Sequence, residues 1–82
     1  MLYACYILYS EKLDRYYVGH TDSIDDRLKE HNEGKSKYTS KATDWVVAYS
    51  EQYEHREVAR SREFEIKRKK SRKYITWLLA NK

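Results

Sequence analysis

A single glutamate on an apolar helix face is the strongest indication of chemistry in this sequence. One face of an expected helix carries four residues at spacings of four, three and four: Ala59, Glu63, Ile66 and Lys70. Because Ala59 and Ile66 are apolar, we expect this face to look into the protein. A carboxylate there must be paired, hydrogen-bonded or bound to a metal ion. Glu63 is therefore either a functional group or half of a salt bridge, for which the candidate partners are Arg27, Arg62 and Lys67.

Arg27 and His31 lie one turn apart on another expected helix, so their side chains can meet one target. An arginine can hold a phosphate through two parallel hydrogen bonds. A histidine can move protons near neutral pH. The same spacing also suits an ordinary amphipathic helix with a polar flank. His20 and His55 lack the partners, at the right spacing, of a structural zinc site, so we do not expect them to bind zinc.

Tyrosine is abundant, with nine residues in 82, and seven of them lie on or beside expected strands: Tyr3, Tyr6, Tyr9, Tyr16, Tyr17, Tyr49 and Tyr53. Most fit the simple role of covering the faces of a small sheet. A tyrosine hydroxyl in a cleft can also take part in proton transfer. The sequence has no glycine-rich phosphate loop and no arrangement typical of a Ser/His/Asp nucleophile.

Positive charge is concentrated towards the end of the sequence. Residues 60–73, here called the basic stripe, hold eight Lys or Arg and two Glu, while the remainder has a small acidic excess. Such a stripe favours a polyanionic partner, nucleic acid first, with a solvated helix face as the alternative. The residues that we expect to contact nucleic acid are Arg62, Lys67, Lys69, Lys70, Arg72 and Lys73.

The composition excludes several classes of protein. The length predicts one domain over residues 1–82. There is no apolar run of 18 residues and no signal-peptide pattern, so we expect no membrane association. The lone Cys5 cannot form an internal disulfide, which favours the cytoplasm. Aromatic residues, at 15%, indicate a packed core. A small domain without a disulfide has to be a tightly packed monomer or a weak homodimer.

The elements that must position these residues follow the order ββαβαα. Residues 2–9 and 16–19 are expected strands that pair as a hairpin, and residues 45–49 a third, well-buried strand. A helix is expected from Ser23, which with Asp26 resembles a capping box, to a stop at Asn32 and Gly34. Residues 35–43 are an expected loop.

Two further helices complete the expected α+β domain. One covers residues 54–69 and carries Glu63. Ser71 can cap the other, whose apolar positions are Ile75, Leu78 and Leu79, with Trp77 alongside.

Several segments together resemble the GIY-YIG nuclease superfamily. The paired signature is Ala4-Cys5-Tyr6-Ile7-Leu8 and Tyr17-Val18-Gly19, with ten residues between the two tyrosines. Three later segments resemble the family in order: Arg27-Leu28-Lys29-Glu30-His31-Asn32, Lys37-Tyr38-Thr39 and Arg62-Glu63-Phe64-Glu65-Ile66-Lys67. The resemblance spans about Tyr3 to Arg72 and is greatest to small stand-alone bacterial members. It departs at Ala4-Cys5, which replace Gly-Ile, at Val18, which replaces Ile, and at His20, where some repair nucleases carry lysine.

The resemblance implies a three-stranded antiparallel sheet flanked by helices and metal-dependent hydrolysis of a phosphodiester. By position, Tyr6 and Tyr17 are the signature tyrosines, and Arg27 would bind phosphate. Glu63 would be the single protein ligand of Mg²⁺ or Mn²⁺. His31 stands where some members have an active-site histidine. We expect Tyr6 to be the general base, with Tyr17 assisting.

Together these features predict a nuclease that acts on nucleic acid, DNA rather than RNA, with structured or damaged DNA as the expected substrate, as in DNA repair. The sequence shows no separate DNA-targeting domain. One alternative is a catalytically weak module that keeps the fold and binds nucleic acid through the basic stripe. Another is a protein-interaction domain whose basic helix binds an acidic partner.

Overall fold

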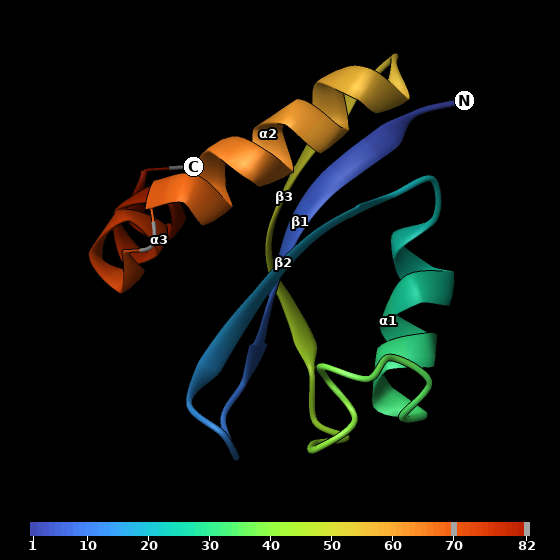
Figure 1. Cartoon of the computed structure of the whole chain (residues 1–82), viewed down its shortest axis with the longest axis vertical. Coiled ribbons are helices and arrows are strands. Elements are labelled where there is room, and N and C mark those ends of the chain that lie inside the picture. The colour runs from blue at the N-terminus through green and yellow to red at the C-terminus, as the bar shows by residue number, and fades with distance from the viewer. Residues whose placement is uncertain (70, 82) are drawn as a thin grey trace.

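A three-stranded antiparallel sheet organises the protein. The computed structural model describes residues 1–69 and 71–81 and has the element order ββαβαα (Figure 1). Strands β1 (Tyr3–Ser10), β2 (Arg15–Thr21) and β3 (Val46–Tyr53) form the sheet in the order β2-β1-β3. The helices are α1 (Ile24–Asn32), α2 (Arg56–Lys69) and α3 (Arg72–Ala80). The predicted α+β class and element order are confirmed.

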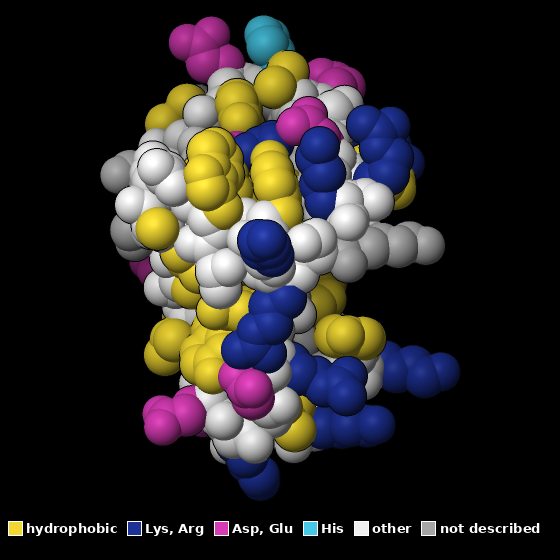
Figure 2. All heavy atoms as spheres, turned by 90° about the vertical axis from the view of Figure 1, so that its left-hand side faces the viewer, with side chains coloured by type: hydrophobic (Ala, Val, Ile, Leu, Met, Phe, Trp, Pro, Cys, Tyr) yellow, Lys and Arg dark blue, Asp and Glu magenta, His cyan; other side chains and the backbone are white. Residues whose placement is uncertain are grey.

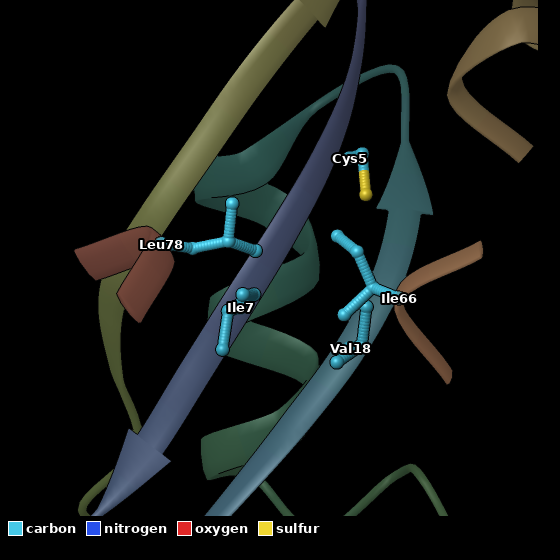
Figure 3. Packing of buried hydrophobic residues seen from close by; sticks show 5 residues of the cluster. All are labelled: Cys5, Ile7, Val18, Ile66 and Leu78. Carbon is cyan, nitrogen blue, oxygen red and sulfur yellow. The ribbon is translucent and has the colours of Figure 1, made fainter. Parts of the chain in front are cut away.

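The central strand, β1, serves two hydrophobic cores because its side chains alternate between the faces of the sheet. One core lies beneath α2 and α3 and contains Cys5, Ile7, Val18, Ile66 and Leu78 (Figure 3). The other, on the face that packs with α1 and the loop before β3, contains Tyr6, Leu8, Ala42 and Trp45. Helices therefore cover both faces of the sheet (Figure 1). Neighbouring residues of β1 reach opposite cores.

Helix α1 begins and ends where its sequence signals predict. The side-chain oxygen of Ser23 accepts a hydrogen bond from the Asp26 backbone N–H at 3.4 Å. The reciprocal bond of a capping box is supplied by Thr21 rather than Asp26, since Thr21 Oγ1 accepts from the Ser23 N–H at 3.1 Å. After the helix, Gly34 adopts φ +77°, a conformation that favours glycine.

Strand β3 differs from its prediction as a well-buried strand over residues 45–49. It starts one residue later and runs to Tyr53, and it lies at the edge of the sheet. Val46 and Val47 are 55% and 38% exposed, whereas Trp45, just before the strand, is buried. The prediction was wrong because apolar composition alone does not show which strand occupies the centre of a sheet.

The two C-terminal helices pack on the sheet face opposite α1. Ser71 caps α3 as predicted, because its side chain accepts from the Tyr74 N–H at 3.1 Å. Arg72, at the start of α3, forms an ion pair with Asp14 in the β1–β2 turn, with 2.6 Å between the guanidinium and Asp14 Oδ1. In the part of the chain that the structure describes, no helix combines the length and hydrophobicity that a bilayer crossing requires.

Candidate active site

Tyr6 packs directly over the backbone of the neighbouring strand. The β1–β2 register places Tyr6 opposite Gly19. A Cβ atom at position 19 would lie 2.6 Å from the Tyr6 hydroxyl oxygen and 3.2 Å from the Tyr17 ring. Glycine is thus required here by space, because any side chain would displace the Tyr6 ring.

Gly19→Ala should therefore unfold more easily than the wild-type protein, by about 1–3 kcal/mol, the usual effect of overpacking a well-packed core. The free energy of unfolding from urea titrations measures this. Ser50→Ala is the matched control, since Ser50 faces Tyr6 in register on the other side of β1 and is exposed. It should change stability by less than about 0.5 kcal/mol. Equal stability of the Gly19→Ala and wild-type proteins would contradict the observed packing of Tyr6.

A buried chain of polar groups starts at the Tyr6 hydroxyl. Tyr6 Oη lies 3.1 Å from His31 Nε2, and His31 Nδ1 lies 2.6 Å from Thr39 Oγ1. Tyr6, His31 and Thr39 come from β1, α1 and the following loop, and all three are almost fully buried. The chain orients the imidazole through both of its nitrogens. It thereby fixes the direction in which the Tyr6 hydroxyl points.

The loop that supplies Thr39 is held by Trp45 and Asn32. Trp45 Nε1 donates to the Thr39 carbonyl oxygen at 3.0 Å. The Asn32 side chain makes two hydrogen bonds with the Trp45 backbone, donating at 3.0 Å and accepting at 2.8 Å. These bonds connect the end of α1 to the start of β3 and keep Thr39 against His31.

Burial favours the neutral forms of both groups of the Tyr6–His31 pair. Desolvation, with a further contribution from Tyr17, raises the pKa of Tyr6 to about 12, although nearby Arg27 opposes the rise. Desolvation and then the charge of Arg27 lower the pKa of His31. A neutral imidazole has one free ring nitrogen that can accept a proton.

Tyr17 and Arg27 border this pair. The Tyr17 ring centroid lies 4.8 Å from that of His31 and 6.4 Å from that of Tyr6. The Arg27 side chain is 35% exposed and has one weak ion pair, with Glu30 at 3.6 Å. The structure therefore brings together four of the predicted site residues, Tyr6, Tyr17, Arg27 and His31. The Arg27 guanidinium is accessible to an anion.

Glu63 approaches from α2, on the other side of β2. Its helix face looks inward as predicted, since Ala59 and Ile66 are buried; Lys70 lies outside the described residues. Glu63 Oε1 lies 2.6 Å from His20 Nδ1, and Oε2 lies 2.6 Å from Lys67 Nζ. Lys67 is thus the salt-bridge partner among the three candidates. Its ammonium also lies 5.7 Å from the centre of the Tyr17 ring, which connects Glu63 to the tyrosine cluster.

The donor set around Glu63 limits what it could hold. Within residues 1–69 and 71–81, no three His, Cys, Asp or Glu side chains are grouped closely enough to cage a metal ion. Mg²⁺ commonly retains several waters and binds proteins through one or two carboxylates together with substrate phosphate. A single carboxylate at 14% exposure fits such a loosely held ion, provided that His20 or Lys67 releases one oxygen.

The basic stripe is less available than its charge suggests. Arg62 forms ion pairs with Glu51 at 2.9 Å and with Glu65 at 2.6 Å, so its positive charge is largely neutralised within the protein. Lys67 and Arg72 are paired with Glu63 and Asp14. Lys69 lies over the Tyr74 ring, Lys73 is exposed, and Lys70 falls outside the described residues. Figure 2 shows Lys and Arg spread among exposed hydrophobic side chains on this side of the molecule.

Two residues of the site had no role assigned from sequence. Thr39 lies in a loop without periodicity, and nothing in its spacing indicates a hydrogen bond to His31. His20 is not expected to bind zinc and stands in the sequence only as a departure from the family pattern, whereas in the structure it contacts Glu63 across 43 residues of sequence. Its position directly after Gly19, on the strand face opposite Tyr17, is the one signal that could have indicated an approach to α2.

The fold and the site define a small α+β domain with a buried Tyr–His–Thr chain, an accessible arginine and a single carboxylate. A family model described as the GIY-YIG catalytic domain matches residues 2–75. The chain belongs to this nuclease family, as the sequence resemblance predicted.

Similar proteins carry the group name UPF0213. One from Bacillus velezensis is 38% identical over 63 residues, which are 72% of this chain and 64% of that protein. One from Staphylococcus haemolyticus is 38% identical over 52 residues, which are 62% of this chain and 63% of that protein. The matches thus span just under two thirds of each relative. The solution NMR structure of a UPF0213 protein from Bacillus halodurans has a TM-score of 0.63 at 30% identity, covering 100% of this chain and 86% of the other.

Proposed function

We propose that this protein is a metal-dependent nuclease that hydrolyses phosphodiester bonds of nucleic acid, with DNA as the expected substrate. The observation that carries the proposal is the buried hydrogen-bonded chain from Tyr6 through His31 to Thr39, beside the accessible Arg27. Membership of the GIY-YIG family supports it. A general base next to a phosphate-binding group is what phosphodiester hydrolysis requires.

In this proposal, Tyr6 relays a proton rather than acting as a preformed phenolate. With a pKa of about 12, only about one Tyr6 hydroxyl in a hundred thousand is ionised at pH 7. If the His31 hydrogen lies on Nδ1 and is donated to Thr39 Oγ1, Nε2 accepts the Tyr6 proton. The Tyr6 oxygen then takes a proton from the attacking water. The hydroxide so formed attacks the phosphorus, the phosphorus–oxygen ester bond on the far side breaks, and the leaving oxygen takes up a proton from solvent.

Arg27 and Glu63 would together stabilise the negative charge of the reacting phosphate, Arg27 directly and Glu63 through a metal ion. The Arg27 guanidinium would hold nonbridging phosphate oxygens. Glu63 would hold one divalent ion, Mg²⁺ or Mn²⁺, which would supply Lewis-acid stabilisation of the developing charge. His20 and Lys67, which contact the Glu63 carboxylate, would set how readily it becomes available.

The direct test is a cleavage assay on labelled duplex, single-stranded, flap and branched DNA and on RNA, with Mg²⁺, Mn²⁺ or excess chelator. We expect metal-dependent cleavage of at least one DNA substrate. Salt-sensitive binding without cleavage under any condition would reject the nuclease and support the catalytically weak binding module instead. Failure to bind any nucleic acid would leave only the interaction domain with an acidic partner.

The contribution of the basic stripe to binding can be measured separately. Its exposed cations without a carboxylate partner, within residues 60–69 and 71–73, include Arg68, Lys69 and Lys73. Replacing these three by glutamine should flatten the slope of log K against log salt on duplex DNA by about 2–3, at about 0.9 per phosphate contact. Equilibrium binding at several salt concentrations gives the slope. If the slope does not change, the stripe is only a solvated face.

A further inference from the structure

A hollow of about 670 Å³ lies beside the candidate active site and takes no part in the proposed hydrolysis. It is lined by Leu13, Arg15, Lys37, Tyr38, Lys41 and Trp45. Its wall therefore combines an aromatic and aliphatic surface with three cations. A second hollow of about 680 Å³ shares Arg15 and Tyr38 with the first and also includes Lys67, the partner of Glu63. Tyr38 thus stands between the first hollow and the Glu63 side of the site.

The cations around the first hollow are free of carboxylates. Among the described residues, Arg15, Lys37 and Lys41 are all exposed, and none lies within ion-pair distance of an Asp or Glu. In the basic stripe, by contrast, Arg62, Lys67 and Arg72 are neutralised by neighbouring acids. All three cations around the hollow are therefore available to an anion, whereas only part of the charge of the basic stripe is.

Tyr38 offers an exposed aromatic surface next to these charges. Its side chain is 59% exposed, although one side of the ring approaches Tyr17, with centroids 5.6 Å apart. Tyr17 in turn contacts His31, which is hydrogen-bonded to Tyr6. An unbroken series of rings therefore runs from the Tyr6 hydroxyl to the hollow.

We propose that the hollow is a subsite for an unpaired nucleotide adjoining the scissile phosphate, with its base stacked on Tyr38 and its phosphates held by Arg15, Lys37 and Lys41. Aromatic rings beside a positively charged groove bind single strands because every base has a stacking face. A base in an intact duplex is already stacked on its neighbours and is not available to Tyr38. This subsite rests on the proposed function in requiring a nucleic-acid ligand, but it does not require cleavage. It favours substrates with unpaired nucleotides over an uninterrupted duplex.

The test is equilibrium binding, by fluorescence anisotropy in chelator, of short labelled oligo-dT and oligo-U and of a blunt DNA duplex of the same length. Tyr38→Ala should weaken single-strand binding about tenfold or more, the typical effect of losing one stacked base. Duplex binding should change less than twofold. Tyr38→Phe should bind like the wild-type protein, because the ring and not the hydroxyl stacks. Phe64→Ala, which removes a 58% exposed aromatic ring from α2, should leave every affinity unchanged.

A second arm tests the charges. Replacing Arg15, Lys37 and Lys41 together by glutamine should lower the single-strand salt slope by about 2, at about 0.7 per contact. The equal change of charge at Arg68, Lys69 and Lys73 should lower it less. Preference for oligo-dT or for oligo-U distinguishes the DNA from the RNA form of the ligand.

The outcomes separate the subsite from the nuclease proposal. If the wild-type protein binds and cleaves but Tyr38→Ala keeps wild-type affinity for single strands, the subsite is rejected and the nuclease stands. The same holds if Tyr38→Ala weakens duplex and single strand equally. If the wild-type protein neither binds nor cleaves any nucleic acid, both proposals fail. Circular dichroism checks that each variant is folded. Because the Tyr38 side chain is mostly exposed, we expect its truncation to leave the fold intact.

Discussion

Glu63→Gln should abolish metal-dependent cleavage while the protein stays folded. A metal ion that stabilises a reacting phosphate contributes several kcal/mol, so its loss should slow cleavage about a thousandfold or more. Glutamine keeps the shape of Glu63, but its one carbonyl oxygen can accept from only one of His20 and Lys67, because its NH2 group donates and does not accept. Because one of these two donors loses its acceptor, the free energy of unfolding should fall by about 1–3 kcal/mol.

Glu65→Gln is the matched control for this prediction. Glu65 lies on the same helix and also forms an ion pair, with Arg62 at 2.6 Å, but it faces away from the site. This variant should cleave like the wild-type protein. Binding of Mn²⁺, measured by calorimetry without nucleic acid, provides a readout apart from activity and should weaken only in Glu63→Gln. Wild-type cleavage by Glu63→Gln, or full wild-type activity in excess chelator, would remove Glu63 as a metal ligand.

The helices could be predicted because their signals are local. Ser23 and Ser71 each cap a helix within three residues of the N–H group that they accept from. The Glu63–Lys67 salt bridge could be predicted in the same way, since residues four apart share a helix face. In each case the partners are close in sequence, so periodicity alone brings them together.

The arrangements that sequence could not show depend on contacts between distant segments. In the sequence Arg62 has the properties of a free positive charge, whereas in the fold it forms an ion pair with Glu51 on β3. Thr39 is an ordinary loop residue until Trp45 holds its backbone and turns its hydroxyl towards His31. The exposure of β3 likewise follows from its place at the edge of the sheet, which the apolar residues at its start do not indicate.

Family resemblance is the source of the roles given to five residues: Tyr6, Tyr17, Arg27, His31 and Glu63. These roles remain predictions, although the structure groups the five side chains around β2.

Tyr6→Phe tests the proposed proton relay and should slow cleavage by about 10²- to 10⁴-fold, the usual contribution of a positioned acid or base. The phenylalanine ring fills the same space over Gly19, so nucleic-acid binding should persist. Stability should fall by about 1–3 kcal/mol, because the buried His31 Nε2 loses its hydrogen-bond partner. Single-turnover cleavage, DNA affinity and melting temperature measure these effects separately.

Tyr49→Phe is the matched control for this change. Burial also raises the pKa of Tyr49 to about 12, and its hydroxyl is hydrogen-bonded to Glu51, but it lies on β3 away from the site. Its removal should leave the cleavage rate nearly unchanged. Tyr17→Phe should slow cleavage less than Tyr6→Phe does, since Tyr17 borders His31 by its ring.

The pH dependence of wild-type cleavage tests the acceptor in the same relay. His31 must be neutral to take the Tyr6 proton, and burial together with Arg27 lowers its pKa below the ordinary 6.5. Cleavage should therefore persist at pH 6.5 and decline only as the pH falls through the lowered pKa, where Nε2 becomes protonated.

Should Tyr17→Phe be inactive while Tyr6→Phe cleaves normally, the base assignment is reversed. If neither substitution slows a measurable cleavage, both tyrosines serve packing alone and the water must lose its proton by another route.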